Sequence, residues 1–382
     1  MGSVKELVEY EKPKSGTMGR GDFVFSDDYS IFDWGKMPDQ IPYKGKSICL
    51  MAAWNFEQLK KTYGFDSHYV GLRDLERLED SIPKIVREGP DKYVVMTSLS
   101  MLKSPTNIMN IHTSNVIKPD FKDGEYDYSY FKENRGNPDK LNNFVIPLEV
   151  IHRNGAPKGS SLFRRLNRME SEGKTDEIEE MLSKYGLKER PRPGEMFPQT
   201  GFEFTTKFEE KDRELSDDEA YEISGLTEEQ FSQLKTVRQA PVNIVYSRGK
   251  EVGLDEFDGK EEYQLCGGHI GVVDVFGTFD ENRFMFNGVQ VSKEILRQIY
   301  KERQPEWVQQ LERAKRVSEE EGIKDWRMLV EIEPKSIDPR ITQLVGEMYA
   351  AGAELYTGIK WWPEVRELDE IMNELELFVS VN

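Results

Sequence analysis

The sequence has 382 residues, of which 37% are hydrophobic and 32% are charged. A chain of this length can bury a sizeable core over two or three structural units, and its composition is not that of a disordered protein. Its 52 Lys and Arg against 70 Asp and Glu give a net charge of −18. General binding to nucleic acid or to an anionic membrane is therefore not expected, because both need a basic surface.

The sequence shows no familiar targeting signal. It has no run of 18 apolar residues that could cross a membrane, and its start, MGSVKELVEYEKPK, has no apolar signal-peptide core. Two cysteines, Cys49 and Cys266, are too few for a disulfide framework. We therefore expect a cytoplasmic protein.

The first half of the chain is predicted to be rich in strands, because its apolar runs are short and rich in aromatic and β-branched residues. The predicted elements, in chain order, are a strand and turn at 22–33, a helix at 47–64 that ends at Gly64, a buried strand at 92–99, a loop or irregular insertion at 120–142 and a buried strand at 143–153.

The second half mixes helices and strands. Ser216 and Thr227 each begin a capping-box pattern, which predicts two helix starts. The other predicted elements are helices in 161–186, a proline-rich loop or lid at 187–201, strands at 243–253 and within 271–286, and charged helices after Val291. This interleaving predicts an α+β or α/β protein.

Two lysines near the N-terminus could bind a polyanion. Lys12 and Lys14 are two residues apart, so their side chains would point the same way on an extended strand. The glycines that follow would let the backbone close over phosphate groups. An exposed strand with a flexible turn explains the same residues, and on this pattern alone it is the favoured interpretation.

The run 150–169 contains five Lys and Arg residues and no acid, which is unusual in so acidic a chain. Ser160 and its neighbours precede a helical pattern, and a helix N-terminus binds phosphate well. Arg153 could pair with a carboxylate or a phosphate. A basic helix face that pairs with acids elsewhere in the fold is the alternative.

A group of acids surrounds one lysine in the second half. Asp258, Lys260 and Glu262 alternate along a predicted strand and would share one face. Asp274 lies among apolar residues, and a buried carboxylate needs a partner. Mg²⁺ is one such partner, since two carboxylates on adjacent strands could hold it against nucleotide phosphates. An ordinary buried ion pair is the other interpretation.

Taken in order, these segments resemble the SAICAR synthetase (phosphoribosylaminoimidazole-succinocarboxamide synthase) family of purine-pathway ligases. The segments similar to its motifs are VEYEKPK, FSDDYSIFDWGKMPDQIPYKGK, IPLEVIHRNGAPKGSSLFRRL, EFTTKFEEKDRELS, DGKEEY and VVDVFGTFDENRF. The likeness covers most of residues 5–300. Glu11 stands where the family has a glycine, Val275 stands where it has an acid, and residues 155–158 enlarge one loop.

The resemblance implies an α+β fold with a small antiparallel β lobe over ATP and a larger mixed lobe that holds the substrates. We expect the lobes at 1–142 and 143–305, with a mainly helical extension at 306–382. The family commonly forms homo-oligomers, so a homodimer is expected. Its partners would be small molecules rather than nucleic acid or membrane.

The activity that the resemblance implies is ligation driven by ATP and Mg²⁺. The carboxylate of CAIR (carboxyaminoimidazole ribotide) would be joined to the amine of L-aspartate through an acyl phosphate, giving SAICAR, ADP and phosphate. A carboxylate is a poor electrophile, and phosphorylation supplies the leaving group that it lacks.

The resemblance also implies roles for particular residues. These are Lys12 and Lys14 on the ATP phosphates, the strand at 144–147 with Glu149 near the adenine, Glu262 and Asp274 on Mg²⁺, Lys260 and Asp258 where the substrates react, and Ser30, Asp33, Arg153, Ser160 and Arg283 on the ribotide. Lys207 and Asp212 lie in a family block without an assigned role.

Two other functions are compatible with the sequence. A diverged ligase could use another carboxylate and another amine, which Glu11, Val275 and the enlarged loop would support. A non-catalytic nucleotide-binding scaffold is the second alternative. It is disfavoured because every position able to hold phosphate or metal keeps a suitable residue.

Overall fold

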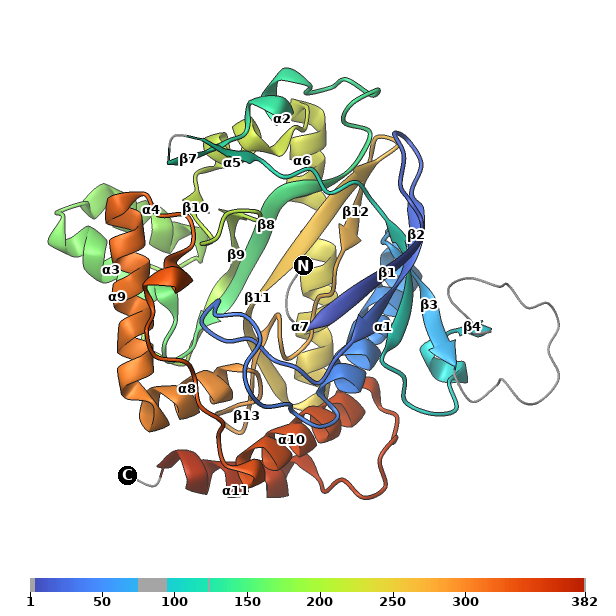
Figure 1. Cartoon of the computed structure of the whole chain (residues 1–382), viewed down its shortest axis with the longest axis vertical. Helices are drawn as coiled ribbons and strands as arrows, with labels where there is room; N and C mark the ends of the chain where they lie inside the picture. Colours follow the sequence, from blue (N-terminus) through green and yellow to red (C-terminus); the bar gives the residue numbers. More distant parts are fainter. Residues whose placement is uncertain (1–3, 75–94, 123, 381–382) are drawn as a thin grey trace.

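The computed structural model describes residues 4–74, 95–122 and 124–380. Within these residues the strands form two large antiparallel sheets, of five and seven strands, and a separate two-stranded hairpin (Figure 1). The strand order is β1-β2-β5-β3-β4 in the small sheet and β10-β9-β8-β11-β13-β14 in the large one, where β12 also pairs with β11. The predicted α+β class with a small antiparallel sheet is confirmed.

The strand bounds show that the two sheets come from successive parts of the chain. The small sheet contains β1 (Lys5–Glu11), β2 (Gly19–Phe25), β3 (Tyr69–Asp74), β4 (Val95–Thr97) and β5 (Ile108–Thr113). The large sheet contains β8 (Asn143–Ala156), β9 (Glu195–Thr206), β10 (Glu214–Leu215), β11 (Leu254–Cys266), β12 (His269–Val273), β13 (Arg283–Phe286) and β14 (Val289–Gln290). The predicted lobe boundaries themselves stay a prediction.

The helices lie mainly in the second half of the chain. They are α1 (Lys44–Tyr63), α2 (Ser129–Glu133), α3 (Ser161–Ser171), α4 (Thr175–Lys184), α5 (Asp217–Ser224), α6 (Glu228–Val237), α7 (Gln239–Val252), α8 (Glu294–Arg303), α9 (Pro305–Glu321), α10 (Pro339–Thr357) and α11 (Leu368–Ser380), with 3₁₀ turns η2 (Leu99–Met101) and η3 (Trp326–Leu329). The helical C-terminal region is as predicted. Among the described helices, none is both long and apolar enough to cross a bilayer.

Local sequence signals set several helix ends. α1 ends at Gly64, whose φ of 63° is left-handed and whose N–H bonds to the Lys60 carbonyl. Ser216 and Thr227 both form the predicted capping boxes at the starts of α5 and α6. The helices pack in succession outward from the large sheet. Helix α7 packs on β11 and α1 packs on α7, while α10 packs on α1 and α11 packs on α10 (Figure 1).

Three local predictions differ from the structure. Residues 243–253 are not a strand but most of α7, where Val242, Val245 and Gly249 are buried at helical spacing. Residues 195–201 belong to β9 rather than to a loop. Pro198 is tolerated there because, among the described strands, only β8 pairs with this half of β9. The predicted insertion at 120–142 contains ordered elements, namely α2 and the hairpin of β6 (Asp120–Lys122) and β7 (Glu125–Asp127). The start of the predicted strand at 92–99 lies outside the described residues.

Candidate active site

A cavity of about 690 Å³ is lined by strands of both large sheets. One part of its lining is apolar and comes from β1, β2, β5, β8 and β12: Leu7, Phe23, Ile111, Val145 and Val273. Another part is charged: Lys5, Lys207, Lys260, Glu149, Glu262 and Asp274. An apolar slot beside a dense set of charges suits a ligand that is itself partly flat and apolar and partly anionic.

Lys260 lies at the centre of the charged part. Its Nζ is 2.6 Å from Glu149 Oε1, 3.7 Å from Glu262 Oε1 and 3.8 Å from Glu281 Oε2. Burial works against the charged form of this lysine, but the carboxylates of Glu149, Glu281 and Glu262 outweigh it and raise its pKa well above the usual value. Lys260 is therefore a permanent cation at neutral pH. It can stabilise negative charge but cannot act as a base.

Glu149 and Glu262 are brought together by strand register. They face each other across the β8–β11 pair. Burial raises the pKa of Glu149 to about 7, although Lys260 acts in the opposite direction. The site therefore holds one carboxyl group that titrates close to neutral pH.

Asp274 immediately follows β12 and adopts a left-handed φ of 62°. Its carbonyl accepts a hydrogen bond from His68 Nε2 at 2.8 Å, which helps to hold this strained residue. The Lys5 ammonium forms an ion pair with its carboxylate. Burial alone would raise the pKa of Asp274, but Lys5 and Lys207 outweigh it and hold that pKa well below its usual value. Lys207, whose role was not assigned from sequence, pairs with Glu262.

The charged part offers a suitable donor set for Mg²⁺. Glu262 lies on β11, and Asp274 lies at the end of β12, which pairs with β11. Carboxylate oxygens are the ligands that Mg²⁺ prefers. Among the described residues, no group of three or more His, Cys, Asp or Glu side chains is arranged to hold a metal. Two carboxylates fit an ion that takes its other ligands from phosphate and water.

Ser30 and Asp33, predicted on the ribotide, line the same cavity. So do Lys293 and Arg297, which the sequence analysis missed. These two cations are four residues apart at the start of α8, so they share a helix face. That spacing, in a segment that follows the last strand, was the signal that could have identified them.

Four other predicted residues do not line the cavity. Asp258 lies beside it but is buried, with Arg153 Nη1 3.0 Å from its Oδ2 and Arg283 Nε 2.7 Å from its Oδ1. Arg153 Nε also donates to Glu203 Oε2 at 3.2 Å. Ser160 caps α3. The sequence could not show that these groups satisfy one another, because their partners come from distant strands.

Lys12 and Lys14 are also absent from the cavity lining. Both are exposed at the tip of the β1–β2 hairpin. That tip is tied down by Asn143, whose Nδ2 donates to the carbonyls of Lys14 at 3.1 Å and Thr17 at 2.6 Å. Lys5, at the start of β1, is the lysine of this strand that reaches the charged part. The binding of Lys12 and Lys14 to the ATP phosphates therefore stays a prediction, which the position of neither side chain relative to the cavity lining supports.

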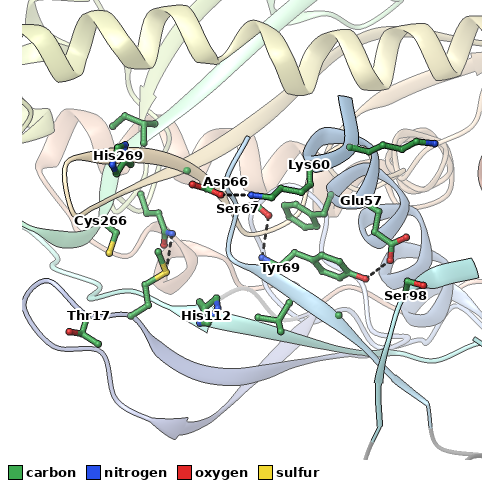
Figure 2. Close-up of a pocket in the computed structure, with 18 of the residues that line it drawn as sticks. Thr17, Glu57, Lys60, Asp66, Ser67, Tyr69, Ser98, His112, Cys266 and His269 are labelled. Atoms are coloured by element: carbon green, nitrogen blue, oxygen red, sulfur yellow. Dashed lines mark hydrogen bonds and ion pairs between the residues drawn. The ribbon is translucent and has the colours of Figure 1, made fainter. Parts of the chain in front are cut away.

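A larger cavity, of about 980 Å³, lies beside the first one and shares His112 and Gln264 with it. Figure 2 shows its side chains. Lys60 pairs there with Asp66 at 2.7 Å, and Glu57 accepts a hydrogen bond from the Tyr69 hydroxyl at 2.8 Å (Figure 2). Because its charges do not converge on the space, we assign the candidate active site to the smaller cavity.

Comparisons with known proteins agree on one family. A model of the SAICAR synthetase family matches residues 2–314. A protein of Archaeoglobus fulgidus, provisionally named phosphoribosylaminoimidazole-succinocarboxamide synthase, is 36% identical over 378 residues, which is 98% of this chain and 99% of that protein. The enzyme of that name from Thermoplasma volcanium is 33% identical over 73% of this chain and 77% of its own. The structure of SAICAR synthase from Saccharomyces cerevisiae in complex with SAICAR has 18% identity, a TM-score of 0.58 and 94% coverage of both chains.

Proposed function

The chain belongs to the SAICAR synthetase family of ATP-dependent carbon–nitrogen ligases, and we propose that it joins the carboxylate of CAIR to the amine of L-aspartate. The observation that carries this proposal is the convergence of Lys5, Lys207 and Lys260 with three carboxylates in one cavity between two sheets. The product named with the yeast relative, SAICAR, is the compound that this reaction would form.

We propose that ATP lies along the cavity with its base in the apolar part, near Val145 at the start of β8. The phosphates would then extend to the charged part. Lys5 and Lys207 would exchange their ion pairs with Asp274 and Glu262 for contacts with phosphate oxygens. Mg²⁺ would be held by Glu262 and Asp274, where it would neutralise phosphate charge.

The chemical steps need little from the protein beyond position and charge. A carboxylate oxygen of the ribotide would attack the γ-phosphorus, and the bond to ADP would break. The amine nitrogen of L-aspartate would then attack the carbonyl carbon of the acyl phosphate, and inorganic phosphate would leave while the amine loses a proton. Lys260, a cation with donors close to the reacting oxygens, would stabilise the negative charge that develops in both steps.

The ribotide is proposed to bind at the end of the cavity lined by Ser30, Asp33, Lys293 and Arg297. Lys293 and Arg297, at the start of α8, suit its phosphate. Arg153, Ser160 and Arg283 would act less directly, by supporting the strands beneath the site.

A diverged ligase with another carboxylate substrate is the second candidate. Arg153 and Arg283, two predicted ribotide ligands, pair with Asp258 instead of lining the cavity. This arrangement would leave fewer charges for a phosphate-bearing substrate. The same chemistry at Lys260 would serve either substrate.

The test is ADP release by the purified protein with ATP, Mg²⁺, CAIR and L-aspartate, omitting each component in turn. The proposal expects ADP formation that requires all four, together with the succinocarboxamide product. Binding of Mg-ATP without turnover of CAIR would favour the diverged ligase. No turnover and no ATP binding would contradict both and leave the scaffold.

A further inference from the structure

The loop at residues 29–34 carries an unusual backbone conformation. Phe32 and Asp33, which line the candidate active site, are consecutive non-glycine residues with left-handed φ angles of 55° and 61°. Such a conformation costs about 1–3 kcal/mol per residue and persists only when the surrounding structure holds it. The position of Asp33 and its neighbour Ser30 therefore depends on what packs against this loop.

The C-terminal segment supplies much of that support. Trp307 on α9 packs edge-on against Phe32 and Trp34, each with ring centroids 5.9 Å apart. Trp326 on η3 lies 6.2 Å from Trp34. The loop is thus enclosed by aromatic side chains from α9 and η3.

Two cations of the same segment fix Asp33 itself. Lys315 Nζ lies 2.6 Å from the Asp33 Oδ2 atom. Arg327 Nη1 donates to the Asp33 carbonyl at 3.2 Å, and its Nη2 pairs with Glu210 Oε2 at 2.5 Å. One residue is therefore held through both its side chain and its backbone.

Both cations lie beyond residue 314, where the family match ends. Arg327 nevertheless lines the cavity together with Ser30, Asp33 and Glu210. The C-terminal extension, to which no role could be assigned from the sequence, thus reaches back to the edge of the site.

We propose that Lys315 and Arg327 are positioning residues for the ribotide substrate, because they hold the loop at residues 29–34 in the conformation that presents Ser30 and Asp33 to the cavity. This inference rests on the proposed function. It assigns part of the binding affinity for the ribotide to a segment outside the family match.

The experiment compares Lys315→Met with Lys211→Met, a matched control. Lys211 also forms an exposed ion pair with α9, through Glu319, but does not touch the loop. We expect Lys315→Met to raise the KM for CAIR about tenfold and to weaken SAICAR binding in calorimetry by a similar factor. The KM for ATP should stay within twofold in both variants, and Lys315→Arg should restore most of the CAIR affinity.

A double-mutant test decides whether Lys315 acts through Asp33. In an Asp33→Asn background, Lys315→Met should have little further effect on the KM for CAIR. An undiminished effect in that background, or an equal rise of all KM values with a loss of thermal stability, would overturn the proposal.

Hydrogen exchange separates this proposal from the proposed function. Amides of residues 29–34 should exchange faster in Lys315→Met than in Lys211→Met, whether or not the protein turns over CAIR. Equal exchange would overturn the positioning role. A wild-type protein without CAIR turnover, but with the expected exchange difference, would contradict only the ligase reaction proposed above.

Discussion

Strand β11 carries two neighbouring sets of charged side chains, Lys260 with Glu262 and Asp258 with its arginine partners, which differ in their surroundings. Lys260 and Glu262 border the cavity, so their ion pairs have one side open to a ligand. Asp258, two residues earlier on the strand, is closed in by Arg153 and Arg283 and is fully paired within the protein. Charged residues of one strand thus form a candidate binding site at Lys260 and Glu262 and a structural ion pair at Asp258. The difference lies in whether a ligand can replace one of the ion-pair partners.

The largest effect that this comparison predicts is on turnover at Lys260. Lys260→Met should lower kcat by about 10³, because it removes the cation that stabilises developing charge. Nucleotide binding, measured by calorimetry, should change far less. Lys250→Met, which removes an exposed lysine paired with Asp255, is the control and should keep full activity. A Lys260→Met protein that binds nucleotide and retains a tenth of the wild-type kcat would contradict the role.

A substitution at Asp258, in contrast, should act mainly on the free energy of unfolding. Asp258→Asn leaves the buried Arg153 and the partly buried Arg283 short of a negative partner, and breaking a buried ion pair costs about 3 kcal/mol or more. Urea unfolding measures the loss. Asp255→Asn, at an exposed pair with Lys250, should cost less than about 1 kcal/mol. Equal free energies of unfolding for the two variants would show that burial does not separate the groups.

The raised pKa of Glu149 predicts a pH dependence of stability. The folded protein keeps the proton up to about pH 7, whereas the unfolded chain loses it near 4.5. The contribution of this group is therefore present below pH 4.5 and is lost as the pH rises through 7. Relative to Glu149→Gln, the free energy of unfolding of the wild type should fall by roughly 3 kcal/mol between pH 4.5 and 8. Parallel curves for the two proteins would mean that the carboxyl group titrates normally.

The sequence predicted the parts of this comparison that depend on local pattern. The alternation of Asp258, Lys260 and Glu262 correctly indicated a strand, and the capping residues Ser216 and Thr227 correctly marked helix starts. Prediction from the sequence failed where tertiary contacts determine the secondary structure. Burial against β11 made residues 243–252 part of helix α7 despite their β-branched residues.

The candidate site shows the same limit. Local spacing placed Lys260, Glu262 and Asp274 near one another, and strand register then brought Glu149 to them. Nothing local indicated that Arg153 and Arg283 would neutralise Asp258, since those contacts join three strands. The local pattern also did not show which lysine of the β1–β2 hairpin would reach the charged part of the cavity. That outcome depends on the residue at which β1 starts.

The smallest predicted effect tests that last point. Lys5→Met should weaken binding of the nucleotide about tenfold, because the Lys5 ammonium lies against Asp274 at the charged part of the cavity. Lys12→Met and Lys14→Met should change the dissociation constant by less than twofold, since both side chains are exposed at the hairpin tip. Titration calorimetry with Mg-ADP measures all three. The reverse order would mean that the hairpin tip folds over the nucleotide when it binds, and the lysines first singled out from the sequence would then hold its phosphates.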